Sequence, residues 1–329
     1  MRAASNVIFN LRISLMGILA IALAGCVSSP GDGGDSAVAK PVFVGELRKD
    51  YGGRLIVQTM VNGQGPFDFI VDTAATQSAV FDNLVDRLDL AVEDQIRRRV
   101  FSLAGVQQRP TTVLERLQMG GVARPDLNVV VFADWDDQER TPQGVLGLDV
   151  LGAYIIRIDP RTSELSLYRR SAAPDFTAMG WAGAPLRASN FGLSGSPLYL
   201  LPGEIGGHRF EMLLDTGSEI SLGNFALLER IVVAPRRVDL GAQATRFNDV
   251  LDRSVEVYNL RYTNLRSAGV NWFDGQMYFT EAQIFKDLGF AENSFAILGN
   301  DILAGRSIAI DLIGLRLYAS PFAPAAEDG

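Results

Sequence analysis

The sequence predicts an all-β protein that consists of two homologous lobes. Three observations support this prediction: short apolar runs rich in β-branched residues, frequent turn residues between these runs, and a set of motifs that recurs in the same order in both halves. Many short strands with frequent turns are typical of all-β folds. The length of 329 residues also suits two domains better than one.

The expected strands follow from local composition. Residues 55–61 (LIVQTMV) are apolar and β-branched, and turn residues at 62–66 (NGQGP) separate them from a second run at 67–71 (FDFIV). Three further strands are expected, at 127–132, 154–158 and 164–168. Few helices are expected, at 79–90 and 281–288, with a single helical turn at 150–154.

An internal repeat divides the chain into the two lobes. Residues 67–73 (FDFIVDT) match residues 210–216 (FEMLLDT), and 145–149 (VLGLD) match 297–301 (ILGND) further along. Several such matches in one order are hard to produce by chance. The repeat therefore places the lobes at residues 43–170 and 188–322, with 171–187 as the linker.

The composition excludes several classes of function. The net charge of −8 argues against a nucleic-acid partner, because phosphate binding needs clustered Lys and Arg. One Cys and one His rule out an intrachain disulfide and a zinc site of several Cys or His. No Gly-x-Ser-x-Gly motif accompanies His208 for a serine mechanism. Carboxylates and water remain for chemistry, so neither a metal nor another cofactor is expected.

The N-terminal residues carry a targeting pattern. Residues 1–12 contain two Arg and no acids, and the apolar run at 13–24 is 12 residues long, which is too short for a membrane span of about 20. Leu23-Ala24-Gly25-Cys26 resembles the bacterial lipobox, which implies that residues 1–25 are removed as a signal peptide and that Cys26 is lipid-modified. A free signal anchor, or an ordinary signal with a Cys there by chance, is the alternative.

The segment after Cys26 predicts a flexible tether. Residues 26–42 are rich in Ser, Gly and Asp and contain few large apolar side chains, so they cannot bury enough surface to fold. We expect the folded part to lie on the periplasmic face of a bacterial membrane. Val27 stands where an inner-membrane retention signal would usually have Asp, which favours the outer membrane.

An Asp-Thr pair follows an apolar strand in each lobe. The two segments are Asp72-Thr73-Ala74-Ala75 and Asp215-Thr216-Gly217-Ser218, and both resemble the Asp-Thr/Ser-Gly-Ser/Ala/Thr signature of the aspartic peptidases. Gly147 and Gly299, each after two apolar residues, resemble that family's second element. The resemblance covers residues 43–322 and implies acid-protease-type β-barrel lobes with a cleft between them.

The resemblance also implies a mechanism and roles for the residues of both motifs. Asp72 and Asp215 would share one proton, one carboxylate activating a water and the other polarising the scissile carbonyl of a peptide or protein substrate. Thr73 and Thr216 would brace the loops, Ser218 would bond a carboxylate oxygen, and Gly147 and Gly299 would pack behind them. Fusion of both lobes in one chain predicts a monomer.

Two features leave alternatives open. Ala74 replaces the usual Gly, so a catalytically inactive protein that binds peptides or an envelope partner is the second hypothesis, and a purely structural envelope protein is the third. Leu103, Ala104 and Gly105 are the expected tip of a hairpin lid at 100–106, with a counterpart at 238–242. An ordinary surface hairpin explains the same pattern.

Overall fold

A computed structural model of the protein describes residues 39–137, 141–191, 196–231, 244–249 and 251–322. The chain divides into two units, residues 1–37 and 38–329, and all described residues belong to the second. Strands account for 53% of the described residues and helices for 11%, which confirms the predicted all-β fold. None of the helices within these ranges has the length and apolar character that a membrane crossing requires.

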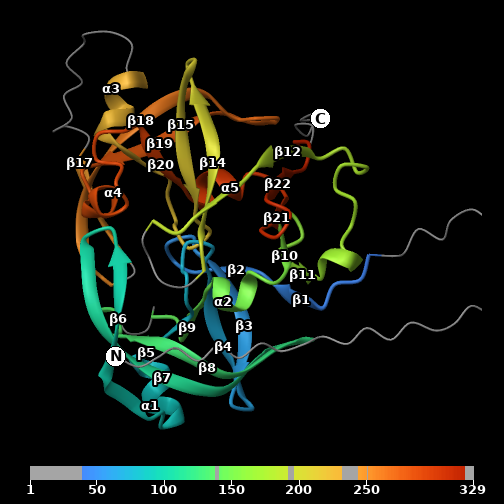
Figure 1. Ribbon diagram of the computed structural model, residues 1–329, viewed down its shortest axis with the longest axis vertical. Coiled ribbons are helices and arrows are strands. Elements are labelled where there is room, and N and C mark those ends of the chain that lie inside the picture. The colour runs from blue at the N-terminus through green and yellow to red at the C-terminus, as the bar shows by residue number, and fades with distance from the viewer. Residues whose placement is uncertain (1–38, 138–140, 192–195, 232–243, 250, 323–329) are drawn as a thin grey trace, which may run out of the picture. The chain divides into compact units, whose positions relative to one another are not determined.

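Eight strands of the first half form one sheet (Figure 1). They are β2 (Arg48–Lys49), β3 (Leu55–Val61), β4 (Gln64–Val71), β5 (Ala79–Phe81), β6 (Val92–Ser102), β7 (Gly105–Met119), β8 (Val122–Phe132) and β9 (Gly144–Leu146). Their order across the sheet is β2-β3-β4-β9-β5-β8-β7-β6, and a ladder between β3 and β7 closes six of them into a ring. Apolar side chains of these strands, such as Val57, Phe69 and Leu117, fill the core.

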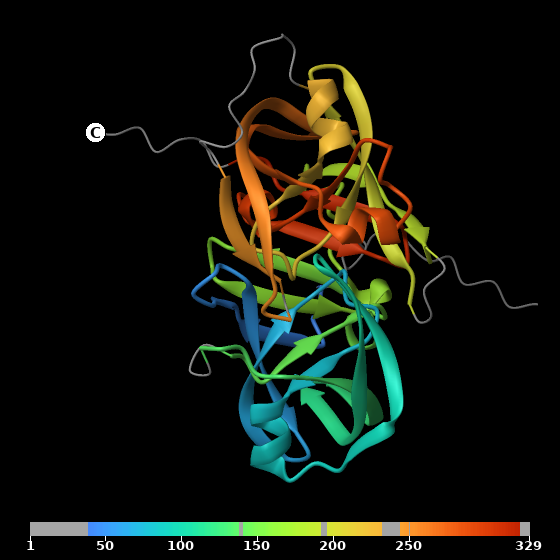
Figure 2. The same cartoon turned by 90° about the vertical axis from the view of Figure 1, so that its left-hand side faces the viewer.

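Eight strands of the second half repeat this arrangement. They are β13 (Arg187–Ser189), β14 (Leu198–Ile205), β15 (His208–Leu214), β16 (Leu222–Asn224), β17 (Ala244–Asn248), β18 (Ser254–Ser267), β19 (Val270–Thr280) and β20 (Phe295–Leu298). The order β13-β14-β15-β20-β16-β19-β18-β17, with a ladder between β14 and β18, matches the first sheet strand for strand. In Figure 2 the two eight-stranded sheets lie at opposite ends of the described part.

A third sheet joins the two halves. Its strands are β1 (Phe43–Glu46), β10 (Ile155–Asp159), β11 (Glu164–Tyr168), β12 (Ala182–Pro185), β21 (Ile308–Asp311) and β22 (Arg316–Ala319). Their order is β1-β11-β10-β21-β22-β12, so the halves meet where β10 pairs with β21 and Ile156 lies opposite Ile310. Both of these side chains are fully buried, and apolar burial therefore fixes one half against the other.

The helices are short. They are α1 (Asp82–Leu88), α2 (Leu148–Leu151), α3 (Phe225–Ile231), α4 (Gln283–Asp287), α5 (Asn300–Leu303) and a 3₁₀ turn at Arg170–Ala172. The helix expected at 79–90 is shorter than predicted, because Ala79–Phe81 pair with Val130–Phe132 of β8 and begin the segment as a strand. The sequence did not predict α3, α5 or the 3₁₀ turn, and the helical turn expected at 150–154 lies at Leu148–Leu151.

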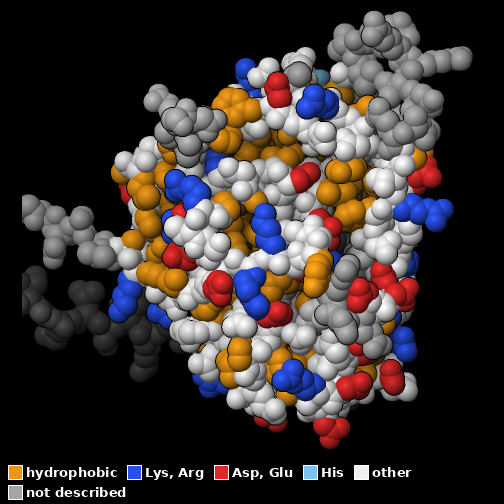
Figure 3. Space-filling model, turned by 180° about the vertical axis from the view of Figure 1, so that it is seen from behind, with side chains coloured by type: hydrophobic (Ala, Val, Ile, Leu, Met, Phe, Trp, Pro, Cys, Tyr) orange, Lys and Arg blue, Asp and Glu red, His pale blue; other side chains and the backbone are white. Residues whose placement is uncertain are grey.

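The surface seen from behind the view of Figure 1 carries mixed charges. On that face, basic side chains are scattered among acidic and apolar ones and do not form one continuous patch (Figure 3). Interspersed charges of both signs are typical of an ordinary solvated surface.

Candidate active site

Asp72 and Asp215 stand at equivalent places in the two halves. Asp72 directly follows β4, and Asp215 directly follows β15. β4 pairs in parallel with β9, which precedes Gly147, and β15 pairs in the same way with β20, which precedes Gly299. The backbone N–H groups of Asp72 and Asp215 continue these ladders, donating to the carbonyls of Leu146 and Leu298 at 3.1 Å. Buried apolar strands therefore carry both carboxylates to the same depth.

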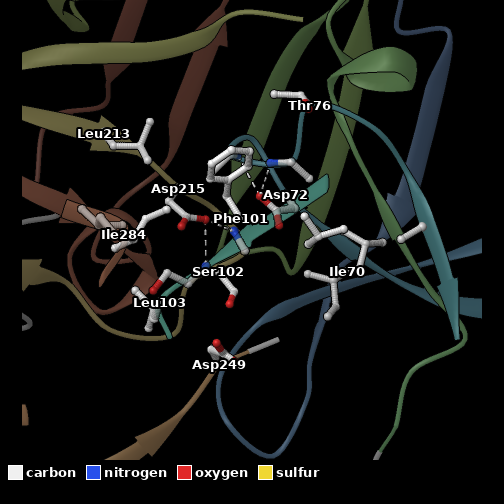
Figure 4. A pocket seen from close by; sticks show the side chains of 18 of the residues that line it. Ile70, Asp72, Thr76, Phe101, Ser102, Leu103, Leu213, Asp215, Asp249 and Ile284 are labelled. Atoms are coloured by element: carbon white, nitrogen blue, oxygen red, sulfur yellow. Dashed lines mark hydrogen bonds between the residues drawn. The ribbon is translucent and has the colours of Figure 1, made fainter. Parts of the chain in front are cut away.

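Each carboxylate is held by the loop that follows it. Asp72 Oδ1 accepts the backbone N–H groups of Ala74 at 2.7 Å and Ala75 at 2.9 Å. Asp215 Oδ1 accepts those of Gly217 at 2.9 Å and Ser218 at 3.0 Å. Figure 4 shows both side chains facing one space, each with its pair of donors. Since one oxygen of each carboxylate is bonded to its own loop, the orientation of the other is also set.

The two threonines tie the loops to each other. The N–H of Thr73 donates to Thr216 Oγ1, and the N–H of Thr216 donates to Thr73 Oγ1, both at 3.1 Å. The Thr73 hydroxyl donates to the carbonyl of Leu214 at 2.9 Å, and the Thr216 hydroxyl to that of Val71 at 2.7 Å. Both threonines are fully buried, so the hydroxyl–backbone bonds expected from the sequence are present and free of competing water.

The loops bring the two carboxyl groups into one electrostatic unit. A Cβ added at Gly217 would lie 2.4 Å from Asp72 Cγ, so the second loop passes directly against the first carboxylate. Burial raises the pKa of Asp72 to about 6, against the opposing effect of its two backbone donors. Burial, followed by the nearby Asp72 carboxylate, raises the pKa of Asp215 well above its ordinary value. A pair of this kind holds one proton over a range of pH.

Ala74 fits the first loop without backbone strain. It is not among the residues with positive φ, so the backbone there does not need glycine. Its methyl group packs against the apolar core. The structure therefore gives no steric reason why this Ala should disturb the loop.

Ser218 differs from the expectation. Its hydroxyl donates to the carbonyl of Ile220 at 2.8 Å rather than to a carboxylate oxygen. Support for Asp215 comes from the backbone N–H of Ser218, because the turn directs the side chain back to its own segment. The residue is at the expected place, but the predicted side-chain bond is wrong.

Gly147 and Gly299 pack behind the two Asp-Thr loops. A Cβ at Gly147 would lie 2.6 Å from the carbonyl carbon of Gln77, and one at Gly299 would lie 2.5 Å from the carbonyl oxygen of Ile220. Only glycine allows this approach of backbone to backbone. The Gly element thus supports both loops, as the sequence led us to expect.

A pair of Ser-Asp bonds completes this support and was missed from the sequence. Ser78 Oγ donates to Asp149 at 2.7 Å and accepts the N–H of Gly147 at 3.0 Å. Ser221 Oγ donates to Asp301 at 2.6 Å and accepts the N–H of Gly299 at 2.9 Å. The signal was in the repeat, since Asp149 and Asp301 belong to matching motifs to which no role was assigned.

A cavity of about 350 Å³ opens beside the two carboxylates. Apolar side chains from both halves form most of its walls: Ile70, Val130, Phe132, Val145, Leu198, Leu213, Ile284 and Ile297. These walls partly desolvate the carboxyl groups, and desolvation is the largest cause of their raised pKa values. The cavity therefore has largely apolar walls and the two acids at its base.

The β6–β7 hairpin lines this cavity. Phe101, Ser102 and Leu103 contribute to its wall, and Leu103 and Ala104 form the turn before Gly105, whose φ of 109° requires glycine. The hairpin expected at 100–106 is therefore present beside the candidate acids. Its expected counterpart at 238–242 lies outside the described residues. By its place in the strand order, the β17–β18 hairpin of the second half corresponds to the β6–β7 hairpin of the first.

An ion-pair network forms one charged side of the cavity. Arg54 Nε lies 2.7 Å from Asp50 Oδ2 and 3.1 Å from Glu219 Oε1, and its guanidinium stacks over Trp135 at 4.1 Å. Arg54 and Glu219 come from different halves and both line the cavity. Nothing in the sequence pattern paired them, because the contact depends on how the halves are arranged.

The described ranges hold no group of three or more His, Cys, Asp or Glu side chains placed to bind a metal ion. Cys26, the predicted site of lipid attachment, lies outside these ranges.

Comparison with known families gives one match. Residues 57–150 match the family model described as Aspartyl protease. The matched segment includes Asp72 and Gly147 and ends before the second half begins. No curated protein matches the chain. The first half is thus similar to the aspartyl protease family, as the Asp-Thr and Gly motifs indicated.

Proposed function

We propose that the protein is an aspartic endopeptidase that hydrolyses peptide bonds with a water activated by Asp72 and Asp215. The observation that carries this proposal is the joined pair of Asp-Thr loops, which holds two desolvated carboxyl groups at the base of one cavity. The family match over residues 57–150 supports the same reaction class.

In the proposed mechanism, Asp72 and Asp215 share one proton, because the pKa of each is raised beside the other. The ionised member takes a proton from the water, while the protonated member donates a hydrogen bond to the scissile carbonyl. The water oxygen bonds to the carbonyl carbon. The C–N bond then breaks as a proton passes to the leaving amine. The dyad needs no cofactor for these steps.

The substrate is proposed to be an extended peptide segment. Such a segment lying beside the β6–β7 hairpin gains main-chain hydrogen bonds as well as apolar contacts in the cavity. We assign the lobes to residues 43–170 and 188–322, with 171–187 between them, and expect the protein to act as a monomer. Nucleic acid is not proposed as a partner.

The proposed location rests on the N-terminal sequence. Residues 1–25 would be removed and a lipid on Cys26 would hold the protein to the periplasmic face of the outer membrane. Metabolic labelling with a fatty-acid probe tests this directly. Label should enter the wild type and be absent from a Cys26→Ala variant.

The activity is tested by incubating full-length protein with a peptide library at several pH values. Asp72→Asn and Asp215→Asn should each abolish cleavage, while Asp89→Asn, a change at an exposed helix C-cap, should retain it. Cleavage that survives in either dyad variant contradicts the mechanism. Peptide binding by the wild type without any cleavage would instead favour the inactive binding protein.

A further inference from the structure

The turns of the two equivalent hairpins touch each other beside the cavity. The N–H of Ala104, in the turn between β6 and β7, donates to Asp249 Oδ2 at 3.2 Å. Arg253, at the other end of the turn between β17 and β18, donates to the carbonyl of Gly105 at 2.8 Å and to the hydroxyl of Ser102. Figure 4 shows Ser102, Leu103 and Asp249 grouped on one side of the dyad.

The described residues in the turn of the second hairpin are hydrogen-bonded to one another. Asp249 Oδ1 accepts the N–H groups of Leu251 at 2.9 Å and Arg253 at 3.0 Å, and the Asp249 N–H donates to the Arg253 carbonyl at 2.9 Å. The Asp249 side chain is 2% exposed and lies 3.6 Å from the Arg253 guanidinium. These bonds orient the carboxylate and the guanidinium toward the first hairpin.

The turn of the first hairpin has one side-chain bond of its own, from the Ser102 hydroxyl to the Gly105 carbonyl at 3.0 Å. Its contacts with the other half use the Ala104 N–H, the Gly105 carbonyl and the Ser102 hydroxyl, and the Leu103 carbonyl accepts the N–H of Ile284 at 3.4 Å. These groups of the other half belong to α4 and to the second hairpin. The position of the first turn therefore depends on these contacts.

The closed arrangement leaves one donor without a partner. Arg253 Nε is buried and has no hydrogen-bond partner within the described ranges. An unsatisfied buried donor costs free energy that offsets part of the gain from the other bonds. The unpaired donor therefore weakens the contact between the two hairpins.

The cavity beside the hairpin is small. A volume of about 350 Å³ is near the lower end of the range for small-molecule sites, about 300–1,000 Å³. Phe101, Ser102 and Leu103 of the hairpin form part of the cavity wall, so movement of the hairpin would widen the space beside the two aspartates.

We propose that Asp249 and Arg253 form a latch that holds the β6–β7 hairpin closed, and that a polypeptide longer than the cavity must release this latch to reach Asp72 and Asp215. The part concerning substrates rests on the proposed function, whereas the latch itself does not. Asp249 and Arg253 act as positioning residues, because they set the position of the hairpin and do not touch the reacting atoms.

Amide hydrogen exchange of the full-length protein tests the latch without any substrate. Arg253→Met keeps the aliphatic length and removes the guanidinium, so exchange across residues 102–106 should become about tenfold faster. Arg261→Met, an exposed change on β18, should leave this exchange as in the wild type. Unchanged exchange in Arg253→Met, with an unchanged melting temperature, overturns the latch.

Asp249→Asn provides a second variant if Arg253→Met folds poorly. An amide oxygen can still accept the N–H groups of Leu251 and Arg253, so the turn is kept while the ion pair is lost. We expect faster exchange at residues 102–106 here as well. Exchange equal to that of the wild type would count against the ion pair as part of the latch.

Cleavage of matched long and short substrates tests control of access. The ratio of kcat/KM for an unfolded protein to that for a short peptide with the same cleavage site should rise severalfold in Arg253→Met and stay constant in Arg261→Met. Faster exchange with an unchanged ratio overturns the role in access. If the wild type cleaves nothing, the proposed function fails, and the exchange experiment still decides whether the latch exists.

Discussion

Replacing Asp72 by Asn should stabilise the folded protein at neutral pH. The folded-state pKa of about 6 lies above the ordinary value of 3.8, so the folded state binds this proton more tightly than the unfolded state does. Stability linked to Asp72 is therefore present at low pH and is lost as pH rises from about 4 through 6. The difference between the two pKa values corresponds to about 3 kcal/mol at pH values well above 6.

The asparagine removes this cost because it stays neutral, and its amide oxygen can still accept the N–H groups of Ala74 and Ala75. We expect Asp72→Asn to raise the free energy of unfolding by up to about 3 kcal/mol near pH 8 and by under about 1 kcal/mol near pH 4. Urea unfolding of the variant and the wild type at both pH values measures this, with the exposed change Asp89→Asn as control.

The opposite result would refute the reasoning. If Asp72 were an ordinary turn residue whose charge strengthens its hydrogen bonds, Asp72→Asn would destabilise the protein most at neutral pH. A loss of stability near pH 8, or an effect that does not change with pH, would mean that the carboxyl group is not held desolvated for chemistry.

Three further predictions concern the same pair of loops. Activity should fall as the pH is lowered through about 6, because Asp72 and Asp215 must have lost one proton to supply a base. A pH–rate profile that falls only near pH 4 would contradict this. Thr73→Ala removes a hydroxyl that makes two buried bonds to the second half, so it should lower the free energy of unfolding by about 2–4 kcal/mol. Thr73→Ser keeps the hydroxyl and should restore most of this loss. Urea unfolding of both variants measures the difference. Gly217→Ala places a methyl group against the Asp72 carboxyl and should abolish activity. The control Gly183→Ala adds a methyl group whose nearest neighbour would be 3.6 Å away, and it should leave kcat/KM unchanged. An active Gly217→Ala variant would show that the loops are farther apart than described.

Much of the fold and of the candidate site was predictable from the pattern along the chain. A buried strand shows itself by an apolar run, and a duplicated lobe shows itself by motifs in the same order, so β3, β4 and the positions of Asp72 and Asp215 followed from the sequence. The glycine at Gly147 was also visible, since a required glycine recurs at the matching Gly299.

Contacts between the halves were not predictable, because no local pattern records them. The Arg54–Glu219 pair and the contacts of Asp249 and Arg253 with Ser102, Ala104 and Gly105 join residues that are far apart in the chain and have no periodic signature. The helix expected at 79–90 was too long for the same reason, since pairing with β8 overrides the local preference of its first residues.

The sequence by itself determined which residues carry the candidate chemistry and that they occur twice, because strand formation and close-packed loops depend on neighbours along the chain. The tertiary structure alone decided how the two copies meet: the shared sheet, the crossed threonine bonds and the contact between the hairpins. These depend on pairing across more than a hundred residues, and they bring two separate aspartates together at one cavity, where burial raises the pKa of both.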